Sequence, residues 1–153
     1  MLVKEIMTKG LLVWCEAQES AEAAAKMMKE KSVGFVPVLE DADSRKVVGV
    51  ITDRDICLRA VANGLDPRFA TIEECMTSSV VSCRPESGVN QVLEIMQKNR
   101  VRRLPVVDAR DRLVGVISMD DLVVHDAAEP KRLVAALKAI YRPAKRRVAS
   151  FAA

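Results

Sequence analysis

The sequence contains one pattern twice: Val47-Val48-Gly49-Val50-Ile51-Thr52-Asp53-Arg54-Asp55-Ile56 and Leu113-Val114-Gly115-Val116-Ile117-Ser118-Met119-Asp120-Asp121-Leu122. Each copy is an apolar run that ends in a hydroxyl residue, and a carboxylate follows three positions after the hydroxyl. Upstream, Phe35-Val36-Pro37-Val38 matches Arg103-Leu104-Pro105-Val106, and Glu5-Ile6-Met7-Thr8 matches Glu74-Cys75-Met76-Thr77. A repeat of about 70 residues is longer than a solenoid repeat, so the sequence predicts two similar small domains.

The apolar patterns predict the same α/β unit in both copies, with domains over residues 1–64 and 65–127 and a separate segment over 128–153. A helix capped by Ser20 should bury Ala21, Ala24, Ala25 and Met28, and its counterpart should bury Val89, Val92, Leu93 and Met96. The expected strands are residues 11–13, 34–39, 47–51, 102–107 and 113–117, and the closing helices are 53–62 and 119–125. The unbroken apolar runs are typical of strands buried on both faces. Because a unit this small buries little surface alone, we expect the two sheets to pack together around a cleft.

Composition supports a globular chain without membrane segments. Half of the 153 residues are hydrophobic but only 3% are aromatic, so aliphatic side chains must form the core. No apolar run is long enough to span a bilayer, and the N-terminus has no signal-peptide pattern. The expected location is therefore cytoplasmic.

Charge is distributed unevenly along the chain. Seven of the 24 basic residues, and no acidic residue, lie from Lys131 onward, which leaves 17 basic against 21 acidic residues before it. Pro130 and the apolar spacing after it predict a short helix that ends before Pro143, with residues 146–153 mobile. Its expected apolar face is Leu133, Val134, Leu137, Ile140 and Tyr141. We expect this face to dock on the acidic body or on a dimer mate, with an anionic partner or nucleic acid as the alternative.

Metal and redox chemistry find little support in the sequence. The four cysteines have no C-x-x-C spacing and His125 is the single histidine, which argues against a zinc site. We expect buried, reduced thiols. Cys15 and Cys83 are counterparts in the two copies, so a redox pair is the alternative. No nucleophile, metalloprotease or phosphate-loop motif occurs, which favours a protein that is not an enzyme.

Taken together, the repeated motifs resemble those of tandem CBS domains (cystathionine-β-synthase domains), an arrangement called a Bateman module. The resemblance rests on the Met-Thr, apolar-Pro and Gly-apolar-apolar-hydroxyl-x-x-Asp motifs of both copies and covers roughly residues 3–125. It implies β-α-β-β-α units, an adenosyl ligand in the cleft between the sheets, and disc-shaped dimers. The first copy departs from the family pattern at Trp14-Cys15-Glu16-Ala17, where members often have threonine or proline, whereas the second keeps Pro85.

The hydroxyl-x-x-carboxylate motif has two compatible interpretations. A hydroxyl between a strand and a helix lies where unpaired N–H groups favour an anion, so Thr52 or Ser118 could contact a phosphate or ribose oxygen. Asp55 or Asp121 could accept hydrogen bonds from ribose hydroxyls. The alternative is a capping box that only starts the helix. Because the motif recurs inside a family-like frame, we favour ligand contact.

The remaining candidate residues surround this motif. Proline interrupts a strand ladder and frees backbone groups that could recognise a purine, although a simple edge strand is the alternative. Arginines beside the motif could bind a phosphate, or could be solvated. Besides the hydroxyl and carboxylate residues, the predicted ligand-binding residues are Val13, Gly34, Phe35, Val36, Pro37 and Arg54 for one site and Val81, Arg102, Arg103, Leu104 and Pro105 for the other. We expect the second copy, with its arginine pair and Pro85, to bind better.

The sequence therefore predicts a CBS-pair regulatory module that binds AMP, ADP, ATP or a related adenosyl ligand such as S-adenosylmethionine. It requires no cofactor and signals to an unknown protein partner in trans. We expect a homodimer, from the resemblance and from apolar helix faces such as Val89/Val92/Leu93/Met96. The alternatives are a ligand-free interaction module and, less favoured because aromatic residues are scarce, a nucleic-acid-associated protein that uses the basic tail.

Overall fold

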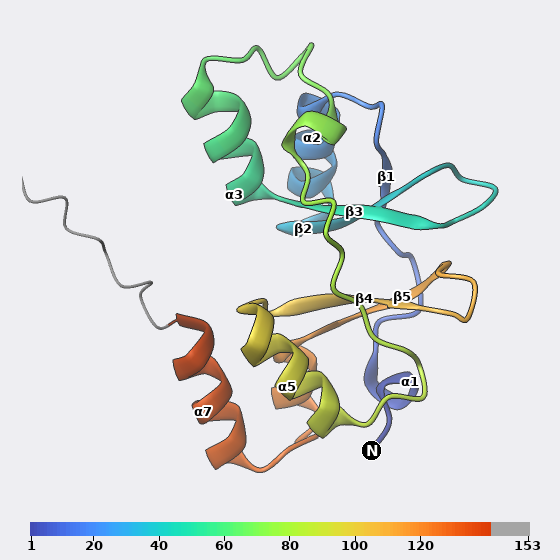
Figure 1. Cartoon of the computed structure of the whole chain (residues 1–153), viewed down its shortest axis with the longest axis vertical. Helices are drawn as coiled ribbons and strands as arrows, with labels where there is room; N and C mark the ends of the chain where they lie inside the picture. The colour runs from blue at the N-terminus through green and yellow to red at the C-terminus, as the bar shows by residue number, and fades with distance from the viewer. Residues whose placement is uncertain (142–153) are drawn as a thin grey trace, which may run out of the picture.

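The computed structural model describes residues 1–141 and consists of two α/β units whose sheets face each other, with helices on the outer sides (Figure 1). The predicted α+β fold is confirmed. The expectations for Pro143 and for residues 146–153 lie outside the described residues. No helix among residues 1–141 has the length and apolar character needed to cross a membrane.

The two units repeat one order of elements. The first comprises β1 (Cys15–Glu16), α2 (Ala21–Lys31), β2 (Phe35–Leu39), β3 (Val47–Thr52) and α3 (Asp53–Asp55), which continues as a π-helical turn (Ile56–Ala60) and a 3₁₀ turn (Val61–Asn63). The second comprises α5 (Val89–Asn99), β4 (Arg103–Val107), β5 (Leu113–Ser118) and α6 (Met119–Val124). The short helices α1 (Val3–Ile6) and α4 (Ile72–Cys75) precede the units, and α7 (Pro130–Tyr141) follows them.

Antiparallel pairs form the centre of each sheet. β2 pairs with β3, and β4 pairs with β5, in equivalent registers that place Pro37 opposite Val50 and Pro105 opposite Val116. β1 adds to β2 in parallel. The predicted strand over residues 11–13 is wrong, because the pairing with β2 begins only at Cys15, opposite Val38.

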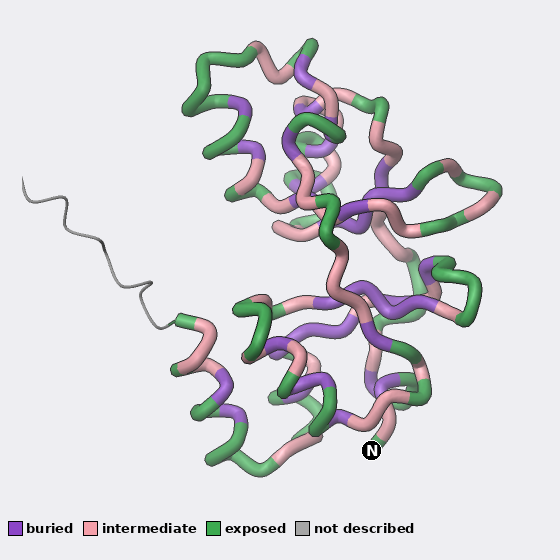
Figure 2. Tube along the Cα trace, in the orientation of Figure 1, coloured by how far each residue is buried: buried purple, intermediate pink, exposed green. Residues whose placement is uncertain are grey.

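Burial corrects two details of the predicted patterns (Figure 2). Ser20 caps α2 by accepting a hydrogen bond from Ala23 N (3.1 Å), and Ala21, Ala24 and Met28 are buried, but Ala25 is exposed. β3 is not buried on both faces. Its residues alternate between buried and half-buried because one face meets the helices and the other faces the opposite unit.

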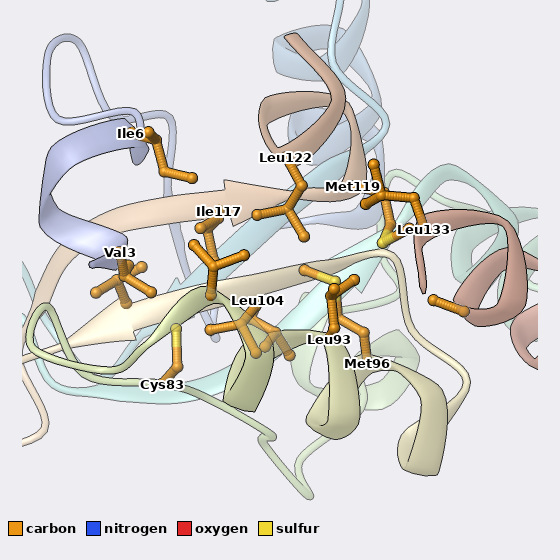
Figure 3. Packing of buried hydrophobic residues seen from close by; sticks show 14 residues of the cluster. Val3, Ile6, Cys83, Leu93, Met96, Leu104, Ile117, Met119, Leu122 and Leu133 are labelled. Carbon is orange, nitrogen blue, oxygen red and sulfur yellow. The ribbon is translucent and has the colours of Figure 1, made fainter. Parts of the chain in front are cut away.

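Each unit contributes a short segment to the hydrophobic core of the other unit. Val3 and Ile6 of α1 pack into the second core with Ile117 and Leu122 (Figure 3), and Val3 N donates a hydrogen bond to Ser87 O (2.9 Å). Reciprocally, the first core includes the buried residues Ala70, Ile72 and Cys75, which precede the second unit. The chain segments 1–64 and 65–127 are therefore interlocked.

Backbone bridges complete this exchange. Thr8 pairs with Val116 beside β5, and Thr77 pairs with Val50 beside β3, each through two hydrogen bonds of 2.9–3.1 Å. The methionine before each threonine then lies on a glycine of the other unit: a Cβ at residue 115 would come within 2.7 Å of Met7 Sδ. The Met-Thr motif of each copy therefore packs against the glycine of the other copy, which explains why both motifs are repeated.

The cysteines lie apart in the fold. Cys15 belongs to the first hydrophobic core and Cys83 to the second, so the alternative of a redox pair is wrong. Burial raises the pKa of the Cys15 thiol to about 12 and that of Cys83 to about 11. Both thiols are therefore protonated and unreactive at neutral pH. Cys57 is exposed.

Helix α7 docks on its own chain, as predicted for the apolar face of this segment. Leu133 and Ala136 are buried in the second core beside α5, and Arg132 lies 3.8 Å from Glu94. Val134 and Tyr141, predicted on the same face, are exposed. Val89, Val92, Leu93 and Met96 are also buried in this core, so the helix face that suggested a dimer interface is an intramolecular one.

We expect Gly115→Ala to lower the free energy of unfolding by about 1–3 kcal/mol, the usual cost of overpacking, because the new methyl group would press on Met7 and on Thr8 O. Denaturant unfolding measures the change. The matched control is Gly10→Ala, whose added Cβ meets no atom within 4 Å and should change stability by less than about 0.5 kcal/mol. Equal effects of the two substitutions would contradict the proposed packing.

We expect Leu133→Ala to destabilise the chain by about 2–5 kcal/mol, because it removes a buried side chain that joins α7 to the second core. Val134→Ala is the control, since Val134 is 49% exposed on the same helix. Thermal unfolding of both variants tests the docking, and a Leu133→Ala protein as stable as the control would show that α7 contributes nothing to the fold.

Candidate functional site

A cavity of about 370 Å³ lies between the two units. Residues 11–13 and 32–35 of the first unit form one side, and β5 with the start of α6 forms the other. Its full lining is Thr8, Leu11, Leu12, Val13, Ser32, Val33, Gly34, Phe35, Arg103, Val116, Ser118, Asp120 and Asp121. The volume falls in the range of small-molecule sites. The lining is mixed: Thr8 and Ser32 lie among apolar residues, and the carboxylates of Asp120 and Asp121 lie at the start of α6.

Ser118 and Asp121 form the polar end of the cavity and also start α6. Ser118 Oγ accepts a hydrogen bond from Asp121 N (3.1 Å), while Asp121 Oδ2 accepts from Ser118 N (2.7 Å) and Ser118 Oγ (2.6 Å). The capping interpretation is therefore confirmed for this copy. Within residues 1–141, Asp121 Oδ1 has no hydrogen-bond or ion-pair partner, which leaves one carboxylate oxygen available at the cavity.

Thr52 and Asp55 repeat the same capping box at the start of α3. Asp55 Oδ2 accepts hydrogen bonds from Thr52 N (2.9 Å) and Thr52 Oγ1 (2.7 Å). The two copies differ at the other carboxylate oxygen, because Asp55 Oδ1 lies 3.4 Å from Arg59 Nη2. Arg59 lies outside the repeated pattern, so the sequence gives no signal for this contact.

The structure separates the three predicted arginines. Arg103 lines the cavity, where its Nη2 lies 3.6 Å from Asp120 Oδ2. Arg102 turns to α7: it donates a hydrogen bond to the Tyr141 hydroxyl (2.6 Å) and its guanidinium lies 5.5 Å from the centre of the tyrosine ring. Arg54 is exposed beside Asp53.

The predicted base pocket is divided between two faces of each sheet. Val36 and Leu104 are buried in the helix-facing cores and are not brought to the cavity. Pro37 and Pro105 point to the opposite faces and are also buried. Pro37 does not lie on an edge strand, because β2 is flanked by both β1 and β3.

β2 can hold Pro37 because the parallel pairing with β1 begins one residue later, at Val38. β1 pairs only with Val38 and Leu39, so no partner strand requires an N–H group from Pro37. In the second unit, Pro105 O accepts a hydrogen bond from Cys83 N (3.2 Å). The carbonyl groups near the prolines are thus partly used within the fold.

Among the other predicted residues, Val13, Gly34 and Phe35 line the cavity, and Val81 packs against the second core. Sequence reasoning missed Thr8, Leu11, Leu12, Ser32, Val33, Val116 and Asp120. Thr8 could have been predicted as a cavity residue, because it belongs to the repeated Met-Thr motif. Its placement beside Val116 depends on the exchange of segments, which no local pattern reveals.

Comparison with known proteins identifies the framework. The family model of the CBS domain matches residues 3–61 and 72–127. The chain is a member of the CBS-domain family. The matched ranges correspond to the two interlocked units, so this is a tandem CBS pair followed by α7.

Several relatives have the same pair as most of their length. Hypoxic response protein 1 of Mycobacterium tuberculosis is 35% identical over 123 residues, which are 80% of this chain and 82% of that protein. The CBS domain-containing protein YhcV of Bacillus subtilis is 34% identical over 123 residues, 80% of this chain and 84% of that protein. Stand-alone CBS pairs are therefore an established arrangement among its relatives.

A solved structure with the same fold contains ligands. The CBS domain pair of protein MJ0100, in complex with 5′-methylthioadenosine and S-adenosyl-L-methionine, has 31% sequence identity and a TM-score of 0.72. The similarity covers 82% of this chain and 95% of that chain. Both ligands of that protein carry an adenosyl group.

Proposed function

We propose that this CBS pair is a non-enzymatic regulatory module that binds an adenosyl ligand in the cavity beside Ser118 and Asp121. The observation that carries the proposal is the free oxygen of Asp121 at the polar end of a cavity of about 370 Å³. A carboxylate oxygen in that place can accept hydrogen bonds from ribose hydroxyls, while the apolar residues of the lining cover the base.

Arg103 and Asp120 would contact the group at the 5′ position of the ligand. The guanidinium favours a phosphate, as in AMP, ADP or ATP. The carboxylate of Asp120 favours a cation such as the sulfonium of S-adenosylmethionine. Because the two side chains lie 3.6 Å apart, a ligand of either charge would compete with their mutual attraction.

The ligand state would be passed to a protein partner in trans, with the chain located in the cytoplasm. α7 supports such a role, because it connects to the cavity through neighbouring residues: Tyr141 binds Arg102, and Arg103 lines the cavity. Within the described part of the basic segment, α7 is held on the chain by Leu133 and Ala136.

The function is tested by thermal unfolding with 5′-methylthioadenosine, S-adenosylmethionine, AMP, ADP and ATP. A ligand that binds only the folded chain should raise the Tm by mass action. Asp121→Asn should weaken binding about 10-fold or more, as expected when a hydrogen bond to a charged group is lost. Asp55→Asn is the matched control, because it changes the equivalent capping box, and it should leave the affinity unchanged.

Absence of any shift with all five compounds, in a folded protein, would reject adenosyl binding and favour a ligand-free interaction module. Equal loss of affinity in the two variants would show that the effect comes from the helix cap.

Self-association is the second part of the proposal. The outer face of the first unit has a groove of about 520 Å³ lined by Met28 and Ile56, and Leu58 and Val61 nearby are 49% and 60% exposed. The corresponding face of the second unit is covered by α7. A homodimer should therefore form through the first unit, and light scattering that gives a monomer mass at micromolar concentration would contradict it.

A further inference from the structure

The two copies of the hydroxyl-x-x-carboxylate motif have the same capping geometry but different surroundings. Four cavity residues have direct counterparts in the first unit at the repeat offsets: Thr8 corresponds to Thr77, Val116 to Val50, Ser118 to Thr52 and Asp121 to Asp55. The backbone bridges are equivalent as well. By symmetry alone, the first unit should present a second ligand site.

Arg59, whose side chain is 42% exposed, contacts two of these counterparts. Its Nη2 donates a hydrogen bond to Thr77 Oγ1 (3.2 Å) and lies 3.4 Å from Asp55 Oδ1. The guanidinium therefore lies between a hydroxyl and a carboxylate whose counterparts line the cavity. It uses the one carboxylate oxygen that the capping box leaves available.

The guanidinium is held by further bonds from the end of α4. Its Nη1 donates to Cys75 O (2.8 Å) and Met76 O (2.5 Å), carbonyl groups at a helix C-terminus that lack helical partners. A planar guanidinium with several donors can satisfy these carbonyls, the threonine and the aspartate together. A ribose would have to break this set of contacts to reach Asp55.

Within residues 1–141, no side chain of the second unit takes the position that Arg59 has in the first. The counterpart of Arg59 is His125, which is exposed and ends α6. The first-unit helix continues through a π-helical turn that includes Arg59, whereas α6 ends at Val124. The difference between the two sites thus follows from the length of the closing helix and from one side chain.

We propose that Arg59 closes the first-unit counterpart of the ligand site, so that each chain binds one adenosyl ligand and not two. This inference rests on the proposed function. It names Arg59 as the residue that sets the stoichiometry, and it makes the first unit a structural partner of the second.

Isothermal titration with 5′-methylthioadenosine tests the proposal. This probe carries no phosphate, so loss of an arginine does not weaken binding through charge. The wild-type chain should bind one ligand, and Arg59→Ala should bind two. Asp121→Asn should weaken binding about 10-fold or more, as above. Arg59→Ala combined with Asp121→Asn should bind one ligand at the opened first-unit site and a second, weakened one at the cavity. Arg68→Gln, an exposed arginine paired with Asp66, is the control and should still bind one ligand.

Arg59→Met, which keeps the aliphatic stem, provides a second variant if loss of the α4 contacts by Arg59→Ala unfolds the chain. One ligand for the wild type and for both Arg59 variants overturns the inference and leaves the proposed function intact. A wild-type chain that binds two ligands also overturns the inference. If the wild type binds no ligand and Arg59→Ala binds one, Arg59 does close the first-unit site, but the cavity at Asp121 is not a ligand site. No binding by any form rejects both.

Discussion

The reciprocal bridges of Thr8 with Val116 and of Thr77 with Val50 hold the rest of the structure in place. Each bridge ties a segment that precedes one unit to a strand of the other. The adjoining helices then complete the opposite cores, and the methionines pack closely on Gly115 and Gly49, where an added Cβ would press on the methionine sulfur. Neither unit has a full core without the other, which suits units too small to bury enough apolar surface alone.

The same constraint creates the cavity. With Thr8 fixed beside β5, the following residues 11–13 must cross from the second unit to the first, and they form one wall of the space between the sheets. The opposite wall is the start of α6, where Ser118 and Asp121 are already ordered by their capping box. Polar groups that are held by the fold lose little conformational freedom when a ligand binds.

The two units have equivalent backbone frameworks, but their closing helices differ in length and in the side chain that follows the capping box. The longer helix of the first unit brings Arg59 onto Asp55, while the shorter α6 leaves Asp121 with an available oxygen. α7 adds a second asymmetry, because Leu133 and Ala136 cover the second core and the Tyr141 hydroxyl accepts a hydrogen bond from Arg102. Local changes outside the repeated pattern therefore decide the chemistry of each copy.

The sequence by itself determined the duplication, the order of the elements, the caps at Ser20, Thr52 and Ser118, and the buried face of α5. These features depend on apolar periodicity and on contacts within one helical turn, which neighbouring residues specify. Only the tertiary structure decided that β1 begins at Cys15, that Thr8 pairs with Val116 at the cavity, that Val36 and Leu104 belong to the cores, and that Arg103 reaches the cavity while Arg102 does not. Each of these depends on contacts between segments far apart in the chain, and no local pattern records which segment packs against which.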